Sequence, residues 1–309
     1  MKKLIFFAFC SAVLFVPVAP AATNPIQVML MDGQSGGTYH NWRATTPVLK
    51  KELEDTGLFQ VTVVTFPASP DGDFTNFKPE FGKYKVVVSN LDSPDWPADL
   101  KMQFEDYVKK GGGVVIVHAA DNAFADWPAY NLMTGLGGWR NRNETAGPRW
   151  YYKDGKLVSD NSPGAAGMHG QRLPFQVTTR DPLHPIMKGL PPVWMHAPDE
   201  LYGKLRGPGQ NMDVLATAHS LLNNKGTGND EPMLMALRYG KGRIFHTIMG
   251  HDVVALSCVG FITTYQRGTE WAATGKVTQK VPPDFPGPDK VSVRADIAAM
   301  APAPADATK

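Results

Sequence analysis

KKGGGVVIVHAADN, residues 109–122, is the stretch that decides the fold. Its run of four β-branched residues predicts a strand buried on both faces, because a strand with one solvent-exposed face alternates polar with apolar residues. Strands of this kind occur in parallel sheets. The strand ends at His118, and the small residues and helix-capping Asp121 that follow predict a sharp turn into a helix. Ligands bind at this carboxyl edge of open α/β sheets, so His118 is either functional or a histidine satisfied within the core.

The flanking sequence alternates strand patterns with helix patterns. Apolar runs predict strands at 26–31, 61–66 and 85–89, and amphipathic patterns predict helices at 42–56 and 97–110. This alternation indicates βαβ units and a doubly wound, mainly parallel sheet, which is an α/β fold. Later strands are expected at 175–178, 214–218, 233–238 and 243–247, with a hairpin turn at 239–242 and a helix at 261–274.

Both ends of the chain are expected to lie outside the folded domain. Residues 1–22 combine two lysines, an apolar run and small residues, which is the pattern of a secretory signal peptide. Their apolar run is shorter than the roughly 20 residues of a membrane-spanning helix. Residues 279–309 are rich in Pro and Ala without apolar periodicity, which predicts disorder. We therefore expect one domain at 23–278, periplasmic or secreted, with no membrane span in the mature chain.

Composition narrows the range of partners and chemistries. The formal net charge of +2 gives no bias toward nucleic acid or an anionic membrane. Cys10 lies in the expected signal peptide, and Cys258 follows an apolar stretch, which predicts a small core residue rather than a nucleophile. The sequence has no Walker or GxGxxG motif. Small polar or sugar-like ligands fit this composition better.

Polar side chains follow several of the predicted strands. They are His40, Asn90, Asp92, His118, Asp121, His251 and Asp252. Carboxyl ends of parallel strands meet at one edge of a sheet, so we expect these residues to converge. Asp199 and Glu200 are adjacent acids in an apolar and aromatic segment, and either can act as a general base or hold a histidine in one tautomer. The alternative for Asp199 is a helix cap.

Two further features bear on ligand binding. Residues 135–168 lose all periodicity and include Trp139 and Trp150, so this insertion is either a functional lid or a surface hairpin. A carboxylate could complete a divalent metal site with imidazoles, although no compact zinc-motif spacing occurs. The imidazoles concerned are His40, His118, His169 and His251.

Four blocks of sequence resemble the ThuA-like (trehalose-utilisation) family. They are His40-Asn41-Trp42-Arg43, the segment 111–120, Asp199-Glu200-Leu201-Tyr202, and the segment 239–252. The resemblance implies a class I glutamine amidotransferase-like fold, a flavodoxin-like three-layer sandwich with a nucleophilic cysteine after its central strand. Here that position reads Val117-His118-Ala119-Ala120, so amidotransfer does not carry over.

The family resemblance implies a carbohydrate context. ThuA-like proteins are associated with disaccharide catabolism and with sugars oxidised at carbon 3 by partner oxidoreductases. We therefore expect an exported protein that acts on disaccharides, glycosides or their 3-keto derivatives as a lyase, hydrolase or isomerase. Its expected partners are a small-molecule carbohydrate and a sugar oxidoreductase of the same pathway. The alternative is a non-catalytic periplasmic carbohydrate-binding or accessory protein.

Acid–base chemistry on a ketone assigns roles to these residues. His118 or His251 would be the base, Glu200 or Asp252 would orient it, and another histidine or a bound divalent cation would polarise the ketone. No other cofactor is expected. The residues expected to bind substrate are His40, Asn90, His169, Asp199, Tyr202, Trp139 and Trp150.

Overall fold

The structure is a computed structural model that describes residues 24–34, 39–68 and 71–302. The expected signal peptide, residues 1–22, lies outside the described residues. In the described ranges, no helix is long and apolar enough to cross a membrane.

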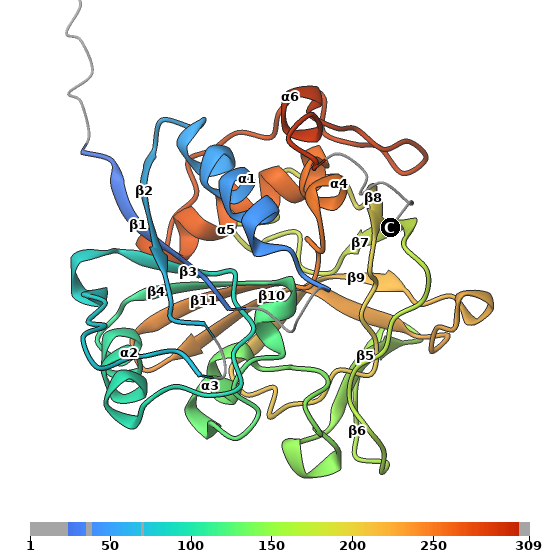
Figure 1. The fold of residues 1–309 in the computed structure, drawn as a ribbon. Coiled ribbons are helices and arrows are strands. Elements are labelled where there is room, and N and C mark those ends of the chain that lie inside the picture. The colour runs from blue at the N-terminus through green and yellow to red at the C-terminus, as the bar shows by residue number, and fades with distance from the viewer. Residues whose placement is uncertain (1–23, 35–38, 69–70, 303–309) are drawn as a thin grey trace, which may run out of the picture.

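One half of the sheet is parallel and runs in the order β2-β1-β3-β4-β11 (Figure 1). Its strands are β1 (Ile26–Asp32), β2 (Phe59–Thr65), β3 (Val86–Ser89), β4 (Gly113–Val117) and β11 (Gly242–Thr247). This is the 2-1-3-4-5 order of doubly wound sheets, in which ligands bind at the carboxyl edge. The strands predicted at 26–31, 61–66 and 85–89 are confirmed to within two residues.

The other half of the sheet is antiparallel. Its strands are β5 (Arg149–Lys153), β6 (Lys156–Asp160), β7 (Leu173–Thr179), β8 (Val193–Asp199), β9 (Met212–His219) and β10 (Asp230–Tyr239). The prediction of a mainly parallel sheet is therefore wrong, and the sheet is mixed. Short connections such as the turn between Tyr239 and Gly242 can join only antiparallel strands, because a parallel pair needs a long crossover.

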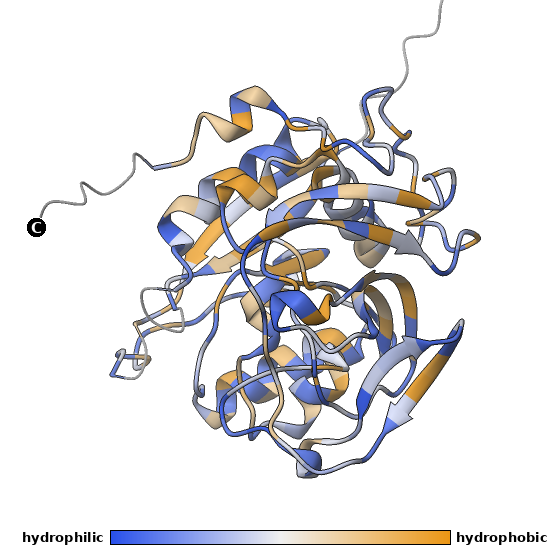
Figure 2. Cartoon of the chain, turned by 90° about the vertical axis from the view of Figure 1, so that its right-hand side faces the viewer, coloured by the Kyte–Doolittle hydropathy of each residue, from blue (hydrophilic) through white to orange (hydrophobic). Residues whose placement is uncertain are grey.

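Helices cover both faces of the parallel half, with α1, α4, α5 and α6 on one side and α2 and α3 on the other (Figure 1). They are α1 (Trp42–Glu54), α2 (Ala98–Lys109), α3 (Pro128–Thr134), α4 (Val253–Leu256), α5 (Val259–Thr274) and α6 (Ala295–Ala298). Single 3-10 turns are η1 (Phe81–Lys83), η2 (His118–Asp121), η3 (Glu144–Ala146) and η4 (Leu222–Asn224). In Figure 2 the helices in front carry both hydrophobic and hydrophilic residues, as expected of helices with one face on a core.

The core forms where α5 lies on the central strands. Val114, Val115 and Ile116 are fully buried, which confirms the strand buried on both faces. A Cβ on Gly113 would lie 2.5 Å from the carbonyl oxygen of Ala272 in α5. The glycine that begins the strand therefore lets the helix backbone approach β4. Cys258 is also fully buried, as the sequence predicts.

The described end of the chain differs from the expected disordered tail. Val293 forms a β-bridge with Cys258, and the ring of Phe285 lies 5.5 Å from that of Trp194. Ile297 on α6 is buried. These sparse anchors, at irregular spacing, hold residues 279–302 on the domain without producing an amphipathic period. Disorder is therefore a wrong prediction for residues 279–302.

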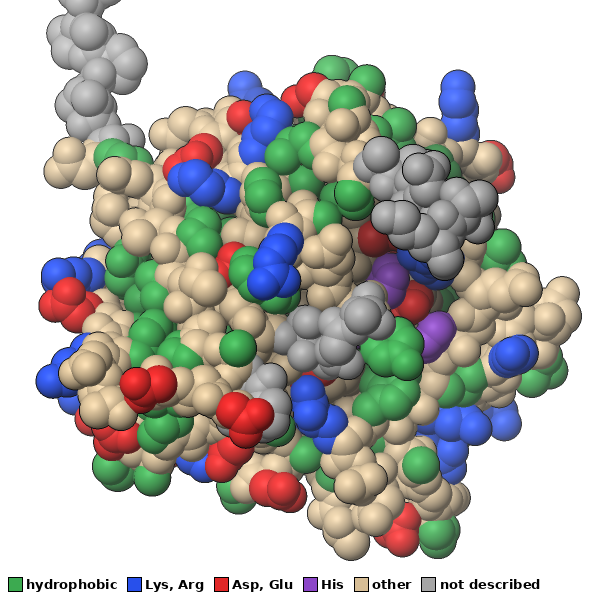
Figure 3. Space-filling view, in the orientation of Figure 1, with side chains coloured by type: hydrophobic (Ala, Val, Ile, Leu, Met, Phe, Trp, Pro, Cys, Tyr) green, Lys and Arg blue, Asp and Glu red, His purple; other side chains and the backbone are tan. Residues whose placement is uncertain are grey.

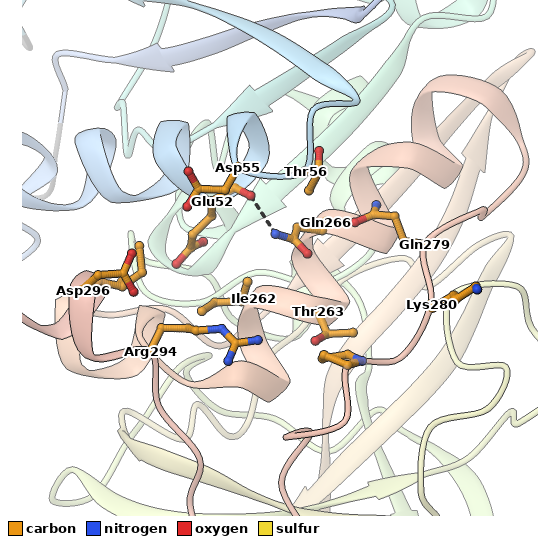
Figure 4. Close-up of a pocket in the computed structure, with 12 residues that line it drawn as sticks. Glu52, Asp55, Thr56, Ile262, Thr263, Gln266, Gln279, Lys280, Arg294 and Asp296 are labelled. Carbon is orange, nitrogen blue, oxygen red and sulfur yellow. Dashed lines mark hydrogen bonds between the residues drawn. The ribbon is translucent and has the colours of Figure 1, made fainter. Parts of the chain in front are cut away.

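A cavity of about 460 Å³ lies between α1, α5 and this C-terminal segment (Figure 4). Glu52 of α1 lines it and is only 1% exposed. Neither carboxyl oxygen of Glu52 has a hydrogen-bond partner in the part of the chain that the structure describes. Burial raises the pKa of Glu52 well above its ordinary value, and Asp55 adds to the effect. The carboxyl therefore keeps its proton at pH values at which an exposed glutamate has lost it.

Replacing Glu52 should change how stability depends on pH. Above the ordinary pKa of 4.5 the unfolded chain releases the Glu52 proton while the folded chain keeps it, so stability falls as pH rises toward the raised folded pKa. The loss approaches about 1.4 kcal/mol per pH unit. Glu52→Gln cannot ionise, so urea unfolding at about pH 5 and about pH 8 should show a flatter pH profile than the wild type. Glu80→Gln, at an exposed position, is the matched control, and an unchanged slope in Glu52→Gln would contradict this account.

Candidate functional site

His118 occupies a strained elbow at the carboxyl end of β4. Its φ is 47°, in the left-handed region that residues other than glycine seldom adopt, and η2 begins at the same residue. The residue is only 2% exposed. A sharp strand-to-helix turn of this kind presents the catalytic nucleophile in α/β-hydrolases, and such strain persists only where the surroundings impose it.

Hydrogen bonds fix the tautomer of His118. Its Nδ1 lies 2.5 Å from the carbonyl oxygen of Ile248, which can only accept, so Nδ1 carries a proton and donates it. In the neutral ring, Nε2 therefore has a free lone pair. The hydroxyl of Tyr202, 2.8 Å away, donates to this nitrogen. The sequence analysis missed Ile248, because a backbone carbonyl leaves no signal in residue type.

Two more imidazoles complete a triangle with His118. The ring centroids of His40 and His118 are 5.1 Å apart, those of His40 and His251 are 5.1 Å apart, and those of His118 and His251 are 5.4 Å apart. His40 precedes α1 and His251 follows β11. The Tyr202 hydroxyl also lies 3.2 Å from Nε2 of His40. The predicted convergence of these residues from distant segments is present in the structure.

Glu200 lies among the imidazoles. Its Oε2 is 3.1 Å from Nδ1 of His251 and 3.6 Å from Nε2 of His118, and its Oε1 is 3.8 Å from Nε2 of His169. One donor atom from each of four side chains falls within 4.8 Å of the others, so these four could hold a metal ion. They are His40, His118, Glu200 and His251.

Charge and burial set distinct protonation states in this cluster. Burial, reinforced by His118 and His251, lowers the pKa of His40 to about 3, so this ring is neutral. Burial alone would raise the pKa of Glu200, but contacts with His118 and His251 more than offset it and hold the pKa well below its usual range. Burial lowers the pKa of His118, but Glu200 and other acceptors outweigh burial and the net shift is upward.

Tyr202 stays protonated beside this charge. Burial, followed by the neighbouring carboxylates Asp121 and Glu200, raises the pKa of Tyr202 well above its ordinary value. The phenol can therefore act only as a neutral hydrogen-bonding group at ordinary pH. It lies between two imidazoles but has a single hydrogen to donate.

Asp199 orients the site rather than facing the cleft. It is the last residue of β8, is 1% exposed, and caps no helix. Its carboxylate accepts from Nε2 of His196 at 2.9 Å and from the backbone N–H groups of Glu200 at 2.8 Å, Gly250 at 2.7 Å and His251 at 3.2 Å. Burial raises the pKa of Asp199, but the contact with His196 outweighs burial and the net shift is downward. This carboxylate therefore sets the position of Glu200 relative to His251.

Asp252 and Asn90 lie outside the cluster. Asp252 caps α4 by accepting from the N–H groups of Val254 and Ala255, and it pairs with Arg172 at 2.6 Å. The structure gives it a capping role, although it was a candidate for orienting the base. Asn90 donates to the hydroxyls of Thr45 and Thr46 at 3.0 Å and lines a cavity beside the imidazoles.

The two candidate tryptophans lie in different parts of the structure. Trp139 lies 4.5 Å from the ring of Tyr202 and 6.1 Å from that of His169. It sits in a turn where three consecutive residues, 139–141, have positive φ, and Arg140 anchors the turn to Asp92 at 2.6 Å. Trp150 lies instead on the hairpin of β5 and β6 and donates to the carbonyl of Gly207. Residues 135–168 thus contain both a wall of the site and a hairpin.

The cluster opens to the surface on the side of His169. The His169 side chain is 38% exposed, against 3% for His118. Figure 3 shows histidine and acidic side chains together on this face, next to a hydrophobic patch. The cavity lined by His40, His118 and His251 measures only about 20 Å³.

Comparisons with known proteins place this arrangement in a wider context. Residues 27–272 match the model of the ThuA family, described as trehalose utilisation. A crystal structure of a ThuA-like protein from Parabacteroides merdae ATCC 43184 is 46% identical, with a TM-score of 0.85 over 89% of this chain and 99% of the other. Another, from Bacteroides uniformis ATCC 8492, is 17% identical, with a TM-score of 0.56 over 85% of this chain and 97% of the other, and shows similarity of fold alone. No curated protein matches the sequence significantly.

Asp199→Asn should destabilise the protein. An amide in place of the carboxylate must turn its NH2 group toward at least one of the present donors, and a buried donor left without a partner costs about 1–3 kcal/mol. Urea unfolding would measure the loss. Asp252→Asn is the matched control, because Asn caps helices about as well as Asp, and it should change stability by less than about 1 kcal/mol. Equal, small effects for both variants would contradict the orienting role of Asp199.

Proposed function

The chain belongs to the ThuA family of trehalose utilisation, and on this premise we propose that it is a carbohydrate-active enzyme. Its proposed substrates are disaccharides, glycosides or their 3-keto derivatives. One observation carries the proposal: three imidazoles, a carboxylate and a phenol from four separate segments meet at one point. Titratable groups that burial and charge drive to different protonation states are typical of acid–base active sites.

A 3-keto-glycoside suits such a cluster. The ketone acidifies the hydrogen on carbon 2, so a base removes this proton and forms an enolate. The enolate then re-forms the ketone and makes a double bond between carbons 1 and 2. This expels the substituent on carbon 1, which leaves as an alcohol after it takes a proton. An elimination of this kind makes the protein a lyase.

The described residues can perform both halves of this reaction. An imidazole of the cluster takes the proton, and the ionised Glu200 stabilises the imidazolium that results. The neutral phenol of Tyr202 hydrogen-bonds to the oxygen on which negative charge develops. The sugar lies toward the surface, beside His169 and Trp139, because the inner cavity is too small for it.

We propose further that the site occupies a reused scaffold. Support comes from the 2-1-3-4-5 strand order, from helices on both faces (Figure 1), and from the elbow after β4. These features fit a class I glutamine amidotransferase-like, flavodoxin-like sandwich to which an antiparallel half has been added. His118 then stands where an amidotransferase carries its cysteine. The pattern of residues 1–22 supports export to the periplasm, where an oxidoreductase would supply the ketone.

The reaction can be tested with a 3-keto-disaccharide and its unoxidised parent. The purified protein should release the second sugar of the disaccharide from the keto form only. Chromatography would detect the released sugar. His118→Ala and Glu200→Gln should lower kcat/KM by about a thousandfold or more, because each removes a group of the acid–base cluster. Binding of the keto sugar without turnover would indicate a carbohydrate-binding protein, the second candidate. Wild-type rates in both variants would contradict the site.

Trp139 should contribute substrate binding. Its ring lies beside the rings of His169 and Tyr202 at the edge of the cluster. Trp139→Ala should therefore raise KM by roughly fivefold, which corresponds to a loss of about 1 kcal/mol of aromatic contact. Trp150→Ala is the matched control and should leave KM unchanged, because Trp150 contacts the hairpin instead. A fall in kcat without a change in KM would show that Trp139 only supports Tyr202.

A further inference from the structure

The hydrogen bonds of the cluster leave two buried imidazole nitrogens without a partner among the described residues. His118 presents the lone pair of Nε2, because its Nδ1 proton is committed to Ile248. With no ion bound, Tyr202 donates its one hydrogen to that nitrogen, and Nε2–H of His40 donates to the phenol oxygen. An ion on Nε2 of His118 takes over that lone pair, and the phenol then keeps only the hydrogen bond that it accepts from His40. The neutral His40 ring then has a bare lone pair on Nδ1. This atom is buried and has no hydrogen-bond partner in the described part of the chain.

His251 shows the same deficit. Its Nδ1 is buried and makes no hydrogen bond to any described residue, although it lies 3.1 Å from Oε2 of Glu200. When Nδ1 is the unprotonated nitrogen of the ring, its lone pair and the carboxylate repel each other, and either a proton on Nδ1 or a cation between the two atoms removes the repulsion. A buried polar atom without a partner costs about 1–3 kcal/mol, so this arrangement is costly without a bound ion or proton donor.

From these contacts we infer that His40, His118, His251 and Glu200 bind one divalent transition-metal ion. A tetrahedral ion with bonds of about 2.1 Å places its ligands roughly 3.4 Å apart. The separations from Glu200 Oε2, 3.1 Å to His251 Nδ1 and 3.6 Å to His118 Nε2, bracket that value. The cavity of about 20 Å³ that His40, His118 and His251 line suits one ion or water and no larger molecule.

The ligand set selects the class of metal. Imidazoles favour Zn²⁺, Fe²⁺ and their neighbours, whereas Mg²⁺ and Ca²⁺ prefer oxygen ligands alone. Ligating histidines commonly donate their other N–H to a backbone carbonyl, which is what His118 does with Ile248. Three neutral imidazoles and one carboxylate leave a divalent ion with a net positive charge, which would attract the oxygen of a substrate ketone.

This inference deepens the proposed function and reassigns its base. Imidazoles that bind a metal cannot take a proton from the substrate. His169 remains available, because it is half exposed and its Nε2 faces the second carboxylate oxygen of Glu200, Oε1, at 3.8 Å. His169 is therefore the proton acceptor for carbon 2, and the ion, when bound, would supply positive charge beside the ketone oxygen. The role in catalysis rests on the proposed function, but metal binding itself does not.

Zn²⁺ binding to the full mature chain tests the inference. After chelation and dialysis, titration calorimetry with Zn²⁺ should show one ion per chain, and elemental analysis should agree. His118→Asn and His251→Asn should weaken binding by about a hundredfold or more, since each removes a ligand. His169→Asn should retain the ion, as should the surface control His219→Asn. Circular dichroism checks that each variant folds.

The outcomes separate the two proposals. Equal Zn²⁺ binding by the wild type, His118→Asn and His251→Asn, or none in the wild type, would overturn the metal site. One bound ion with no turnover of any keto sugar would support the metal site and contradict the enzyme. A His169→Asn variant that keeps its ion and loses turnover would support both the metal site and the reassigned base.

Discussion

The buried carboxylate of Asp199 is the interaction on which the site depends. It ends β8 in the antiparallel half and accepts hydrogen bonds from Gly250 and His251, which follow β11 in the parallel half. One side chain thus joins the two halves of the sheet at the carboxyl edge. Neither half contains the whole site: His40, His118 and His251 come from the parallel half, and Glu200 and Tyr202 come from the antiparallel half. The mixed sheet is therefore a requirement of this constellation.

The sequence predicts the parallel half well because its signals are local. A run such as Val114–Val117 is apolar throughout, and helix and strand alternate with clear periods between it and the N-terminus. Convergence of His40, His118 and His251 followed from topology alone. Pairing in the antiparallel half is set by contacts between distant strands, which leave no local signal. The apolar residues of β8 do not alternate regularly, so the sequence does not predict a strand there. Asp199 and Asp252 look alike in sequence, yet one orients the site and the other caps α4.

Strain and burial at the elbow are compensated by the fold. The left-handed backbone of His118 costs free energy on its own, and its fully enclosed ring must find partners for both nitrogens. Ile248 supplies one partner through its carbonyl and Tyr202 supplies the other. A position that costs this much and still holds an oriented imidazole beside a cavity is better explained by chemistry than by packing. A Val, Leu or Met in place of His118 would fill the same core without those requirements.

Size and charge divide the site into two compartments. The inner cavity has room for a single ion or water molecule and is lined by His40, His118 and His251. Two imidazole nitrogens there have no hydrogen-bond partner among the described residues, and the carboxylate of Glu200 lies within 4 Å of His118 and His251. The outer region, beside His169 and Trp139, reaches solvent and has the aromatic and polar groups that suit a sugar ring. Glu200 joins the compartments, because its two oxygens face opposite ways, one toward His251 and His118 and the other toward His169. A carboxylate in that position transmits the charge of an inner cation to the outer imidazole, so the affinity of one compartment for its ligand must depend on the occupancy of the other.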